Sequence, residues 1–287
     1  MSAAADGMRP VPPFRSEGPG GGVESDRVRT QAYRVTVVIP ALNEAENLKA
    51  VLPRVDEGYE IVLVDGGSED GTVETARSIR PDIVVVQQER AGKGDALACG
   101  FAAASGEIIV MLDADGSARP EEIPSFVDAL SRGADFAKGS RFLRGGGSAD
   151  ITRVRRTGNW LLGQAVNILF GTRYTDLCYG YNAFWARALE RLRIDCDGFE
   201  IETLMNIRAA RTGCRVVEVP SYEDPRLHGE SKLRTFRDGW RVLCTIVGER
   251  LAGAPAGEPV ASGVGVDEPL VAEIQLAGET ELATSAP

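Results

Sequence analysis

The sequence predicts a single α/β domain in which a mostly parallel sheet is covered by helices on both faces. Short, continuous apolar runs alternate with segments of helical length over the first half of the chain. Strands that are buried on both faces of a parallel sheet have this uninterrupted apolar pattern, whereas half-exposed strands alternate apolar and polar residues. Apolar residues also make up 43% of the 287 residues, which is enough for a large core.

The expected strands of the first half span residues 35–39, 61–64, 83–86 and 107–112. After the first strand, Asn43 is followed three residues later by Glu46, the spacing of a capping box, which predicts that Asn43 caps a helix. Asp70 is expected to cap a helix that begins near Thr72. A third helix is expected over residues 95–104.

In the second half we expect helices over residues 121–131, 160–170, 200–211 and 232–250. We also expect a polar strand near residues 135–139 and a late strand over residues 215–220. Gly213 fits the left-handed position that ends the helix over 200–211. The Gly- and Arg-rich segment 143–156 is expected to be mobile. The last helix has an apolar face formed by Leu233, Phe236, Trp240, Leu243 and Val247.

Residues 1–33 and 251–287 are expected to be a disordered leader and a disordered acidic tail, because small residues, Pro and Gly dominate both. The folded domain is therefore placed at residues 34–250. The formal net charge is −10, but the tail holds six acidic residues and no Lys or Arg. The folded part is nearly balanced, which does not suggest nucleic-acid binding through bulk charge.

The cysteine and histidine contents restrict the chemistry. The five cysteines are scattered and never spaced CxxC, which argues against a disulfide scaffold and a zinc site and favours a reducing cytosol. With His228 alone, the chain cannot build a centre of several histidines. No run approaches the roughly 18 apolar residues of a membrane span, and no signal-peptide pattern is visible. We therefore expect a cytoplasmic protein.

Polar residues follow three of the expected strands where each strand ends. They are Pro40-Ala41-Leu42-Asn43-Glu44, Asp65-Gly66-Gly67-Ser68 and Asp113-Ala114-Asp115. Ligands of an open α/β sheet bind beyond the carboxyl ends of its strands, so these groups are expected to meet at one edge. Asp113 and Asp115 suit a hard divalent cation that carries a diphosphate. Asp65 can accept a hydrogen bond from a base, and Asp113 can also reach a ribose.

Each group has a simpler explanation when it is taken alone. Asn43 and Asp65 can be ordinary cap and turn residues, and the acidic pair can be a turn after a strand. Lys93, between Gly92 and Gly94, is as consistent with a solvated lysine as with a phosphate ligand, since the P-loop spacing is absent. The three crossings together favour a nucleotide site, and the glycines beside Lys93 allow close backbone approach.

The chain resembles the family 2 glycosyltransferases in the ordered segments VTVVIPALNEAENL, VDGGSEDGT, GKGDAL, DADGS and KGSRF. The later segments TDLCYGYNAF, GFEIE and HGESKL are similar to the dolichol- or polyprenyl-phosphate mannose synthase branch. This resemblance implies the GT-A fold, which has a Rossmann-like half for the nucleotide sugar and an adjoining half for the acceptor. We place the two halves at residues 34–120 and 121–250.

The resemblance also implies roles for residues at the sheet edge. Asp113 and Asp115 would hold Mg²⁺ or Mn²⁺ on the donor diphosphate. Ser117 stands where several synthases of this branch have Gln as a further ligand on the metal side. Serine is a shorter and weaker ligand, so the resemblance leaves the metal and its full coordination open. Nucleotide contacts are implied for Pro40, Glu44 and Asp65, and we place Asn43 and Gly67 of the same crossings with them.

Basic residues form a second candidate group. Arg141 and Lys232 lie within segments that resemble the family, which favours phosphate binding for both. Arg226, Ser231 and Arg234 accompany Lys232 late in the chain. Arg144, Arg153 and Arg155 flank the glycines at 145–147. They can be phosphate ligands on a loop that closes over a substrate, or a solvated face.

The need for a general base depends on the acceptor. A hydroxyl acceptor requires one, whereas a phosphate monoester is already largely ionised at neutral pH. Asp176, Glu200 and Glu202 are the candidates. Glu200 and Glu202 are expected to point in different directions, and one can equally be a first-turn charge that favours the helix dipole. We assign Asp176 and Glu202 to the site with Asp115 and Arg141, and leave the role of Asp176 open.

The hypothesis is an inverting, metal-dependent transfer of a hexose from GDP-mannose or a UDP-hexose to polyprenyl phosphate, at the cytoplasmic face of the membrane. The helices expected over 160–170 and 232–250 can rest on a bilayer, although core packing is the commoner role of such apolar faces. One alternative is the same fold acting on a soluble acceptor, such as a secondary metabolite or a glycan. Another is a nucleotidyltransferase or a regulator that binds sugar nucleotides.

Overall fold

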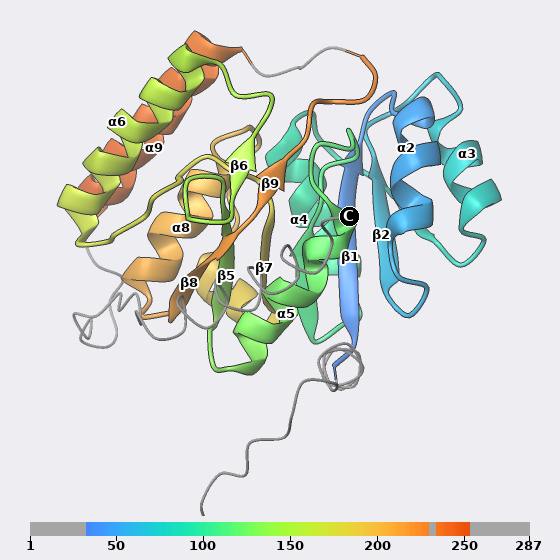
Figure 1. The fold of residues 1–287 in the computed structure, drawn as a ribbon, viewed down its shortest axis with the longest axis horizontal. Coiled ribbons are helices and arrows are strands. Elements are labelled where there is room, and N and C mark those ends of the chain that lie inside the picture. The colour runs from blue at the N-terminus through green and yellow to red at the C-terminus, as the bar shows by residue number, and fades with distance from the viewer. Residues whose placement is uncertain (1–32, 230–233, 253–287) are drawn as a thin grey trace, which may run out of the picture.

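The computed structural model describes residues 33–229 and 234–252 (Figure 1). Apart from Tyr33, Leu251 and Ala252, the predicted leader and acidic tail lie outside the described residues, and so do Lys232 and Leu233. The helices and strands below belong to the described part of the chain.

A seven-stranded sheet runs through the described residues in the order β3-β2-β1-β4-β7-β5-β8. Its strands are β1 Val35–Ala41, β2 Glu60–Asp65, β3 Val84–Gln87, β4 Ile108–Met111, β5 Phe136–Ser140, β7 Asn182–Trp185 and β8 Val216–Pro220. Neighbouring strands are parallel except at β7, which is antiparallel to both β4 and β5. The predicted mostly parallel sheet is confirmed, whereas β7 was not predicted. A two-stranded ribbon pairs β6 Gly147–Ser148 with β9 Tyr222–Glu223.

Helices cover both faces of this sheet (Figure 1). One face carries α2 Ala45–Val51, α3 Thr72–Ile79 and α5 Ile123–Ser131. The other face carries α4 Lys93–Ala103 and α8 Ile201–Arg211, with the short α7 Leu189–Leu192 before α8. The long helices α6 Arg153–Phe170 and α9 Thr235–Leu251 lie side by side and pack on α8 (Figure 1).

The strand β1 shows why the apolar runs predicted buried strands. Val37 and Ile39 pack into the core beneath α2 and α5, whereas Val38 between them packs into the core beneath α4. Successive side chains of a strand point to opposite faces. A strand with helices on both faces therefore excludes water from both sets of side chains, and the apolar run follows.

The first helix begins differently from the prediction. Asn43 has a left-handed backbone with φ of 56°, and its side-chain oxygen accepts a hydrogen bond from the Glu69 backbone N–H at 2.9 Å. The first N–H of α2, that of Ala45, donates instead to Asp70 at 3.0 Å. The predicted capping box at Asn43 is wrong, because its left-handed backbone turns the side chain toward the loop after β2. The same loop places the Asp70 carboxylate beside the first N–H of α2.

Three elements of the second half also differ from the prediction. Helix α6 begins at Arg153 rather than near residue 160, and Thr152 caps it by accepting a hydrogen bond from the Arg155 N–H. The segment expected to be mobile contains β6, which the partner strand β9 holds. The strand expected near 135–139 is buried along its whole length, including Lys138.

The apolar face predicted for the last helix is mostly exposed. Phe236 and Trp240 are 87% and 66% exposed, while α9 buries Val242 and Ile246 against the domain. Across residues 33–229 and 234–252, every helix is too short or too polar to cross a membrane.

Candidate active site

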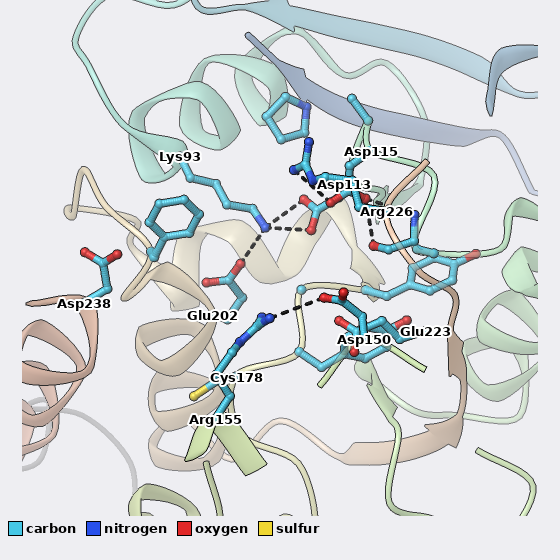
Figure 2. Close-up of a pocket in the computed structure, with 18 of the residues that line it drawn as sticks. Lys93, Asp113, Asp115, Asp150, Arg155, Cys178, Glu202, Glu223, Arg226 and Asp238 are labelled. Atoms are coloured by element: carbon cyan, nitrogen blue, oxygen red, sulfur yellow. Dashed lines mark hydrogen bonds and ion pairs between the residues drawn. The ribbon is translucent and has the colours of Figure 1, made fainter. Parts of the chain in front are cut away.

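A cavity of about 770 Å³ opens at the carboxyl ends of β1 and β4 and continues toward α6 and α9. Figure 2 shows acidic and basic side chains from several elements converging on it. Its wall at the sheet edge includes Pro40, Glu44, Gly66, Gln88, Lys93, Asp113 and Asp115. Its wall at the two long helices includes Ile151, Val154, Gly158, Leu162, Gly239 and Val242. The charged edge of the sheet and an apolar region therefore share one continuous space.

Asp113 lies at the end of β4 and forms an ion pair with Lys93, the first residue of α4. The Lys93 Nζ lies 2.7 Å from Asp113 Oδ1 and 2.8 Å from Glu202 Oε1 (Figure 2). Burial lowers the pKa of Lys93, but the two carboxylates outweigh it and hold this pKa above its ordinary value. Lys93 is therefore a cation held by two carboxylates, with only 12% of its side chain exposed, rather than a solvated side chain.

The turn that presents Lys93 is shaped by its two glycines. A Cβ on Gly94 would lie 2.2 Å from the Cys196 carbonyl oxygen, and the Gly94 N–H donates to the Asp197 carbonyl at 2.9 Å. The close approach that the glycines allow is therefore made to the backbone before α8, whereas the sequence suggested an approach to phosphate. That contact brings Glu202, near the start of α8, within reach of Lys93.

Asp115 is held by two different partners. Its Oδ1 accepts hydrogen bonds from the Ser117 N–H at 3.0 Å and the Ser117 hydroxyl at 2.7 Å. Its Oδ2 lies 3.0 Å from Nη2 of Arg226, whose Nη1 lies 3.1 Å from Glu44 Oε1. Ser117 therefore fixes the carboxylate of Asp115, and Arg226 joins it to Glu44 on the neighbouring strand crossing.

The crossing after β2 reaches the cavity through its backbone. Gly66 lines the cavity, whereas Asp65 and Gly67 do not. The Asp65 carboxylate accepts hydrogen bonds from the Gly67 N–H at 3.1 Å and from Gln87 at 3.0 Å. Burial raises the pKa of Asp65, but hydrogen bonds from Ser68, Gln87 and the backbone hold this pKa below its ordinary value. Asn43 also lies off the cavity wall.

Arg141, in the cavity wall, is clamped between two carboxylates. Its Nε lies 2.7 Å from Asp176 Oδ2, and its Nη1 lies 3.0 Å from Glu223 Oε2. Burial raises the pKa of Asp176, but Arg141 outweighs it and holds this pKa below its ordinary value. Arg141 and Glu223 line the cavity, whereas Asp176 is fully buried and does not. Asp176 is thus placed to position Arg141.

The candidate bases are not equally placed. Asp176 also accepts a hydrogen bond from Asn159 at 3.1 Å, which adds to its contacts with Arg141. Glu200 accepts from the Gly198 N–H and does not line the cavity. Glu202 lines it but is paired with Lys93. Lys232 lies outside the described residues.

Glu223 and Gly180 were not predicted at the site. Glu223 comes from the chain after β8, where the sequence offered no motif around it. Arg226, from the same segment, belongs to the basic residues that the sequence offered for phosphate binding, but its contact with Asp115 was not predicted. Gly180 lies within the segment CYGYN, and a Cβ there would be 2.9 Å from Lys93 Nζ and 3.1 Å from Glu202 Oε1. The sequence could have indicated Gly180, because it lies in the segment TDLCYGYNAF together with the candidate base Asp176.

The acidic pair fits a cation that shares its ligands with a substrate. In the described part of the chain, no group of three or more His, Cys, Asp or Glu side chains is arranged to hold a metal ion. Mg²⁺ commonly takes one or two carboxylates from the protein and the rest of its ligands from substrate phosphates and water. Asp113 and Asp115, facing a cavity, suit that division of ligands.

Residues 36–193 match the Glycosyl transferase family 2. The chain belongs to this family.

Two relatives and one solved structure place this family 2 glycosyltransferase more closely. It is 33% identical to the undecaprenyl-phosphate mannosyltransferase of Micrococcus luteus, over 70% of this chain and 87% of the relative. It is 34% identical to the polyprenol monophosphomannose synthase of Mycolicibacterium smegmatis, over 78% and 88%. The crystal structure of glucosyl-3-phosphoglycerate synthase from Mycobacterium tuberculosis with Mg²⁺ and UDP is similar, with a TM-score of 0.63 and 24% identity over 84% of this chain and 88% of that one.

These similarities confirm the predicted GT-A fold and glycosyl transfer as the activity. They favour glycosyl transfer over the two alternatives, a nucleotidyltransferase and a regulator that binds sugar nucleotides, which the nucleotide-binding half alone would allow.

Proposed function

We propose that this enzyme transfers a hexose, with inversion, from a nucleoside diphosphate sugar to polyprenyl phosphate, with Mg²⁺ or Mn²⁺ as cofactor. The observation that carries the proposal is the single cavity that joins the acidic pair to an apolar region between α6 and α9. The names of the two relatives, which concern undecaprenyl phosphate and polyprenol, agree with an acceptor that is both phosphorylated and apolar.

The donor would bind at the sheet edge. Pro40, Gly66 and Gln88 form the part of the wall that suits a base and ribose, and Lys93 brings a positive charge beside it. A divalent cation held by Asp113 and Asp115 would supply Lewis-acid stabilisation of the departing nucleoside diphosphate. The UDP in the similar solved structure supports a nucleotide of this kind.

The acceptor would enter from the side of the long helices. Ile151, Val154 and Val242 give this end of the cavity an apolar wall. Arg155 and Arg237 also line it, each paired with an acid that lines the same end, Asp150 and Asp238. An ionised phosphate needs no general base. This agrees with the site, in which Asp176 and Glu200 lie off the cavity wall and Glu202 is held by Lys93. We therefore propose that Asp176 positions Arg141 rather than accepting a proton.

The direct test is a product assay on the purified protein. Labelled GDP-mannose or UDP-glucose is mixed with undecaprenyl phosphate and Mn²⁺, and the label that passes into organic solvent is counted. We expect label in the organic phase with one of the donors, lost when EDTA is added and in the Asp115→Asn variant. Label that passes only to a soluble phosphorylated or hydroxyl acceptor would contradict the lipid acceptor and leave glycosyl transfer in place.

We also propose that the enzyme contacts the inner face of the cell membrane from the cytoplasm, through the outer surfaces of α6 and α9. Trp160, Phe236 and Trp240 are largely exposed there, close to the apolar end of the cavity. Arg237 and Arg241 on α9 bring positive charge to the same surface, which complements anionic lipid headgroups. A polyprenyl phosphate could then reach the cavity without leaving the bilayer.

Vesicle sedimentation tests this contact. We expect the protein to sediment with vesicles that contain phosphatidylglycerol. The double variant Phe236→Ser/Trp240→Ser should bind the vesicles on the order of 100-fold more weakly, because burying each aromatic side chain in the interface contributes about 1.5–3 kcal/mol. Val84→Ser, which removes an exposed apolar residue from β3, is the matched control. Equal sedimentation of the double variant and the wild type would contradict this surface.

A further inference from the structure

We propose that Arg226 occupies the oxygen of Asp115 that is left for a cation, and that a nucleoside diphosphate must draw this guanidinium away before a divalent cation binds tightly. The inference rests on the proposed use of a nucleotide sugar with a metal ion, and it concerns how the two ligands depend on each other. Arg226 acts through Asp115 and is therefore a positioning residue.

Asp115 has one oxygen to offer. Ser117 donates two hydrogen bonds to Oδ1, from its backbone N–H and its hydroxyl, which occupies that oxygen. Oδ2 faces Arg226, with Nη2 at 3.0 Å. A cation that binds Asp115 through Oδ2 must therefore displace the guanidinium.

Glu44 increases the hold of Arg226 on this position. The guanidinium bridges Asp115 and Glu44, and its side chain is only 20% exposed. Both carboxylates lie in the cavity wall, where partial burial strengthens an ion pair relative to one in water. A free divalent cation would thus compete with a positive charge that two carboxylates already hold.

The opposite carboxylate is held by a cation that is less free to leave. Lys93 pairs with Asp113 and is also tied to Glu202, with only 12% of its side chain exposed. Arg226 is the more exposed of the two. We therefore place the exchange at Asp115 and keep Lys93 on Asp113.

The side chain of Arg226 can move without its backbone. The Leu227 N–H donates to the Asp115 carbonyl at 3.2 Å, and the Asp224 N–H donates to the Ser117 carbonyl at 2.8 Å. These bonds fix the segment 224–227 on the acidic turn, on either side of Arg226. The exchange therefore requires only a change of rotamer by one long side chain.

A diphosphate supplies a new anionic partner for the displaced guanidinium and further oxygen ligands for the cation. Phosphate oxygens accept bidentate hydrogen bonds from arginine, so Arg226 would exchange one anion for another. The same diphosphate supplies further ligands to the metal, to which Asp113 and Asp115 contribute only two carboxylates. By thermodynamic linkage, the factor by which nucleotide tightens metal binding equals the factor by which metal tightens nucleotide binding.

The test measures Mn²⁺ binding by the loss of the free Mn²⁺ signal in electron paramagnetic resonance, with the full chain and without turnover. Titrations are done alone, with UDP and with GDP. The variants are Arg226→Met, which keeps length without charge, and Arg226→Lys, which keeps the charge. Arg119→Met is the matched control, because Arg119 ties the same segment through Asp224 at 2.6 Å and does not contact the acidic pair. Asp224→Asn replaces it if that variant does not fold.

We expect a nucleotide to tighten Mn²⁺ binding to the wild type by a factor in the common range of about 5–150. Arg226→Met should bind Mn²⁺ alone about tenfold more tightly than the wild type, and the effect of the nucleotide should shrink by a similar factor. Arg226→Lys should stay close to the wild type, and so should Arg119→Met.

Two results would overturn the inference. The first is an Arg226→Met variant that binds Mn²⁺ no more tightly than the wild type, or no more tightly than Arg119→Met. The second is wild-type Mn²⁺ binding that neither UDP nor GDP changes. The proposed function is judged separately, by transfer of label to polyprenyl phosphate in the wild-type protein. A wild type that forms the lipid product but fails here would lose only the coupling through Arg226.

Discussion

At the scale of single residues, Arg141 connects Glu223 in the cavity wall to Asp176 behind it. Asp176 is fully buried, and Arg141, which directly follows β5, is 6% exposed. Burial removes water as an alternative partner, so each charge depends on the one opposite. This makes Asp176 far more sensitive to substitution than an exposed acid.

Replacing Asp176 by Asn should lower the free energy of unfolding at neutral pH by about 3–5 kcal/mol, because it leaves the buried Arg141 with one carboxylate fewer. Urea denaturation measures the change. Asp82→Asn is the matched control, since Asp82 also pairs with an arginine, Arg80, but is 61% exposed. An exposed pair of this kind contributes at most about 1 kcal/mol. A loss no larger than that in Asp176→Asn would contradict the buried clamp.

The same substitution predicts a pH dependence. The folded-state pKa of Asp176 is lowered, so its contribution to stability is present above the ordinary Asp pKa of about 4. It is lost as the pH falls from there through the folded-state pKa. The difference in stability between the wild type and Asp176→Asn should therefore shrink below about pH 4. A constant difference from pH 7 to pH 3 would show that Asp176 is not ionised in the folded protein.

Gly180 gives a second prediction for a single residue. Its φ is not in the left-handed region, so alanine is compatible with the backbone, but the new Cβ would lie 2.9 Å from Lys93 Nζ. We expect Gly180→Ala to reduce turnover on the order of 10- to 100-fold by displacing Lys93 from Asp113. Gly163→Ala, whose Cβ would meet nothing closer than 3.9 Å, should keep its activity and gain up to about 1 kcal/mol of stability. Kinetics and thermal unfolding of both variants provide the measurement.

The residues of the acidic pair could be predicted because they stand together in the chain directly after a buried strand. The contact of Asp115 with Arg226 could not, since it depends on how the chain returns after β9. Asp176 was predicted as a site residue, whereas the structure buries it against Arg141 and off the cavity wall, a placement that depends on tertiary packing. Local spacing indicates which side chains gather at a strand end, whereas their ion-pair partners come from distant segments.

At the scale of elements, α6 and α9 determine what the cavity can admit. Both helices place a glycine in the cavity wall, Gly158 in α6 and Gly239 in α9, and a Cβ at either position would meet nothing within 4 Å. A glycine inside a helix costs roughly 0.5–1 kcal/mol relative to alanine. The absence of a side chain at Gly158 and Gly239 keeps this end of the cavity open, which offsets that cost.

Leucine at either position should fill the apolar end of the cavity. We expect Gly158→Leu and Gly239→Leu to lower transfer to polyprenyl phosphate by roughly tenfold or more, with nucleotide binding unchanged. Gly248→Leu is the matched control, because Gly248 lies on α9 in open space but away from the cavity. Transfer assays and nucleotide titrations on the three variants separate the two effects. Full activity in both cavity variants would move the acceptor elsewhere.

The two long helices were predicted from their apolar residues, but their environment was not. The periodic positions Phe236 and Trp240 indicated an apolar face, for which core packing was the commoner explanation. The structure buries the neighbouring positions Val242 and Ile246 and leaves that face in solvent. Periodicity shows that a helix has an apolar side, and only the rest of the fold shows what lies against it.

At the scale of the whole molecule, the seven-stranded sheet joins the two predicted halves into one unit. Strand β7, from the acceptor half, pairs along β4, from the nucleotide half, and its other edge pairs with β5. The four residues of β4 are each at most 1% exposed. The sequence predicted the halves from their motifs but gave no sign of β7, because Asn182–Trp185 is short and lies in a segment dominated by a motif.

A fragment of residues 34–120 should therefore fail to fold on its own. It would leave the hydrogen-bonding edge of β4 unpaired and uncover the core beneath α8, which favours aggregation. Size-exclusion chromatography and urea denaturation of the fragment and the full chain test this. A monomeric fragment that unfolds cooperatively would show that the halves are independent.

The reversed direction of β7 also limits how such enzymes can be recombined. In a chimera that joins the donor-binding half of one relative to the acceptor half of another, β4 and β7 would come from different parents. The two strands would still have to pair along their whole length. Chimeras cut between β4 and α5 would thus mix two sequences at the centre of the sheet. Chimeras that take residues 182–185 from the same parent as the donor-binding half should fold more often.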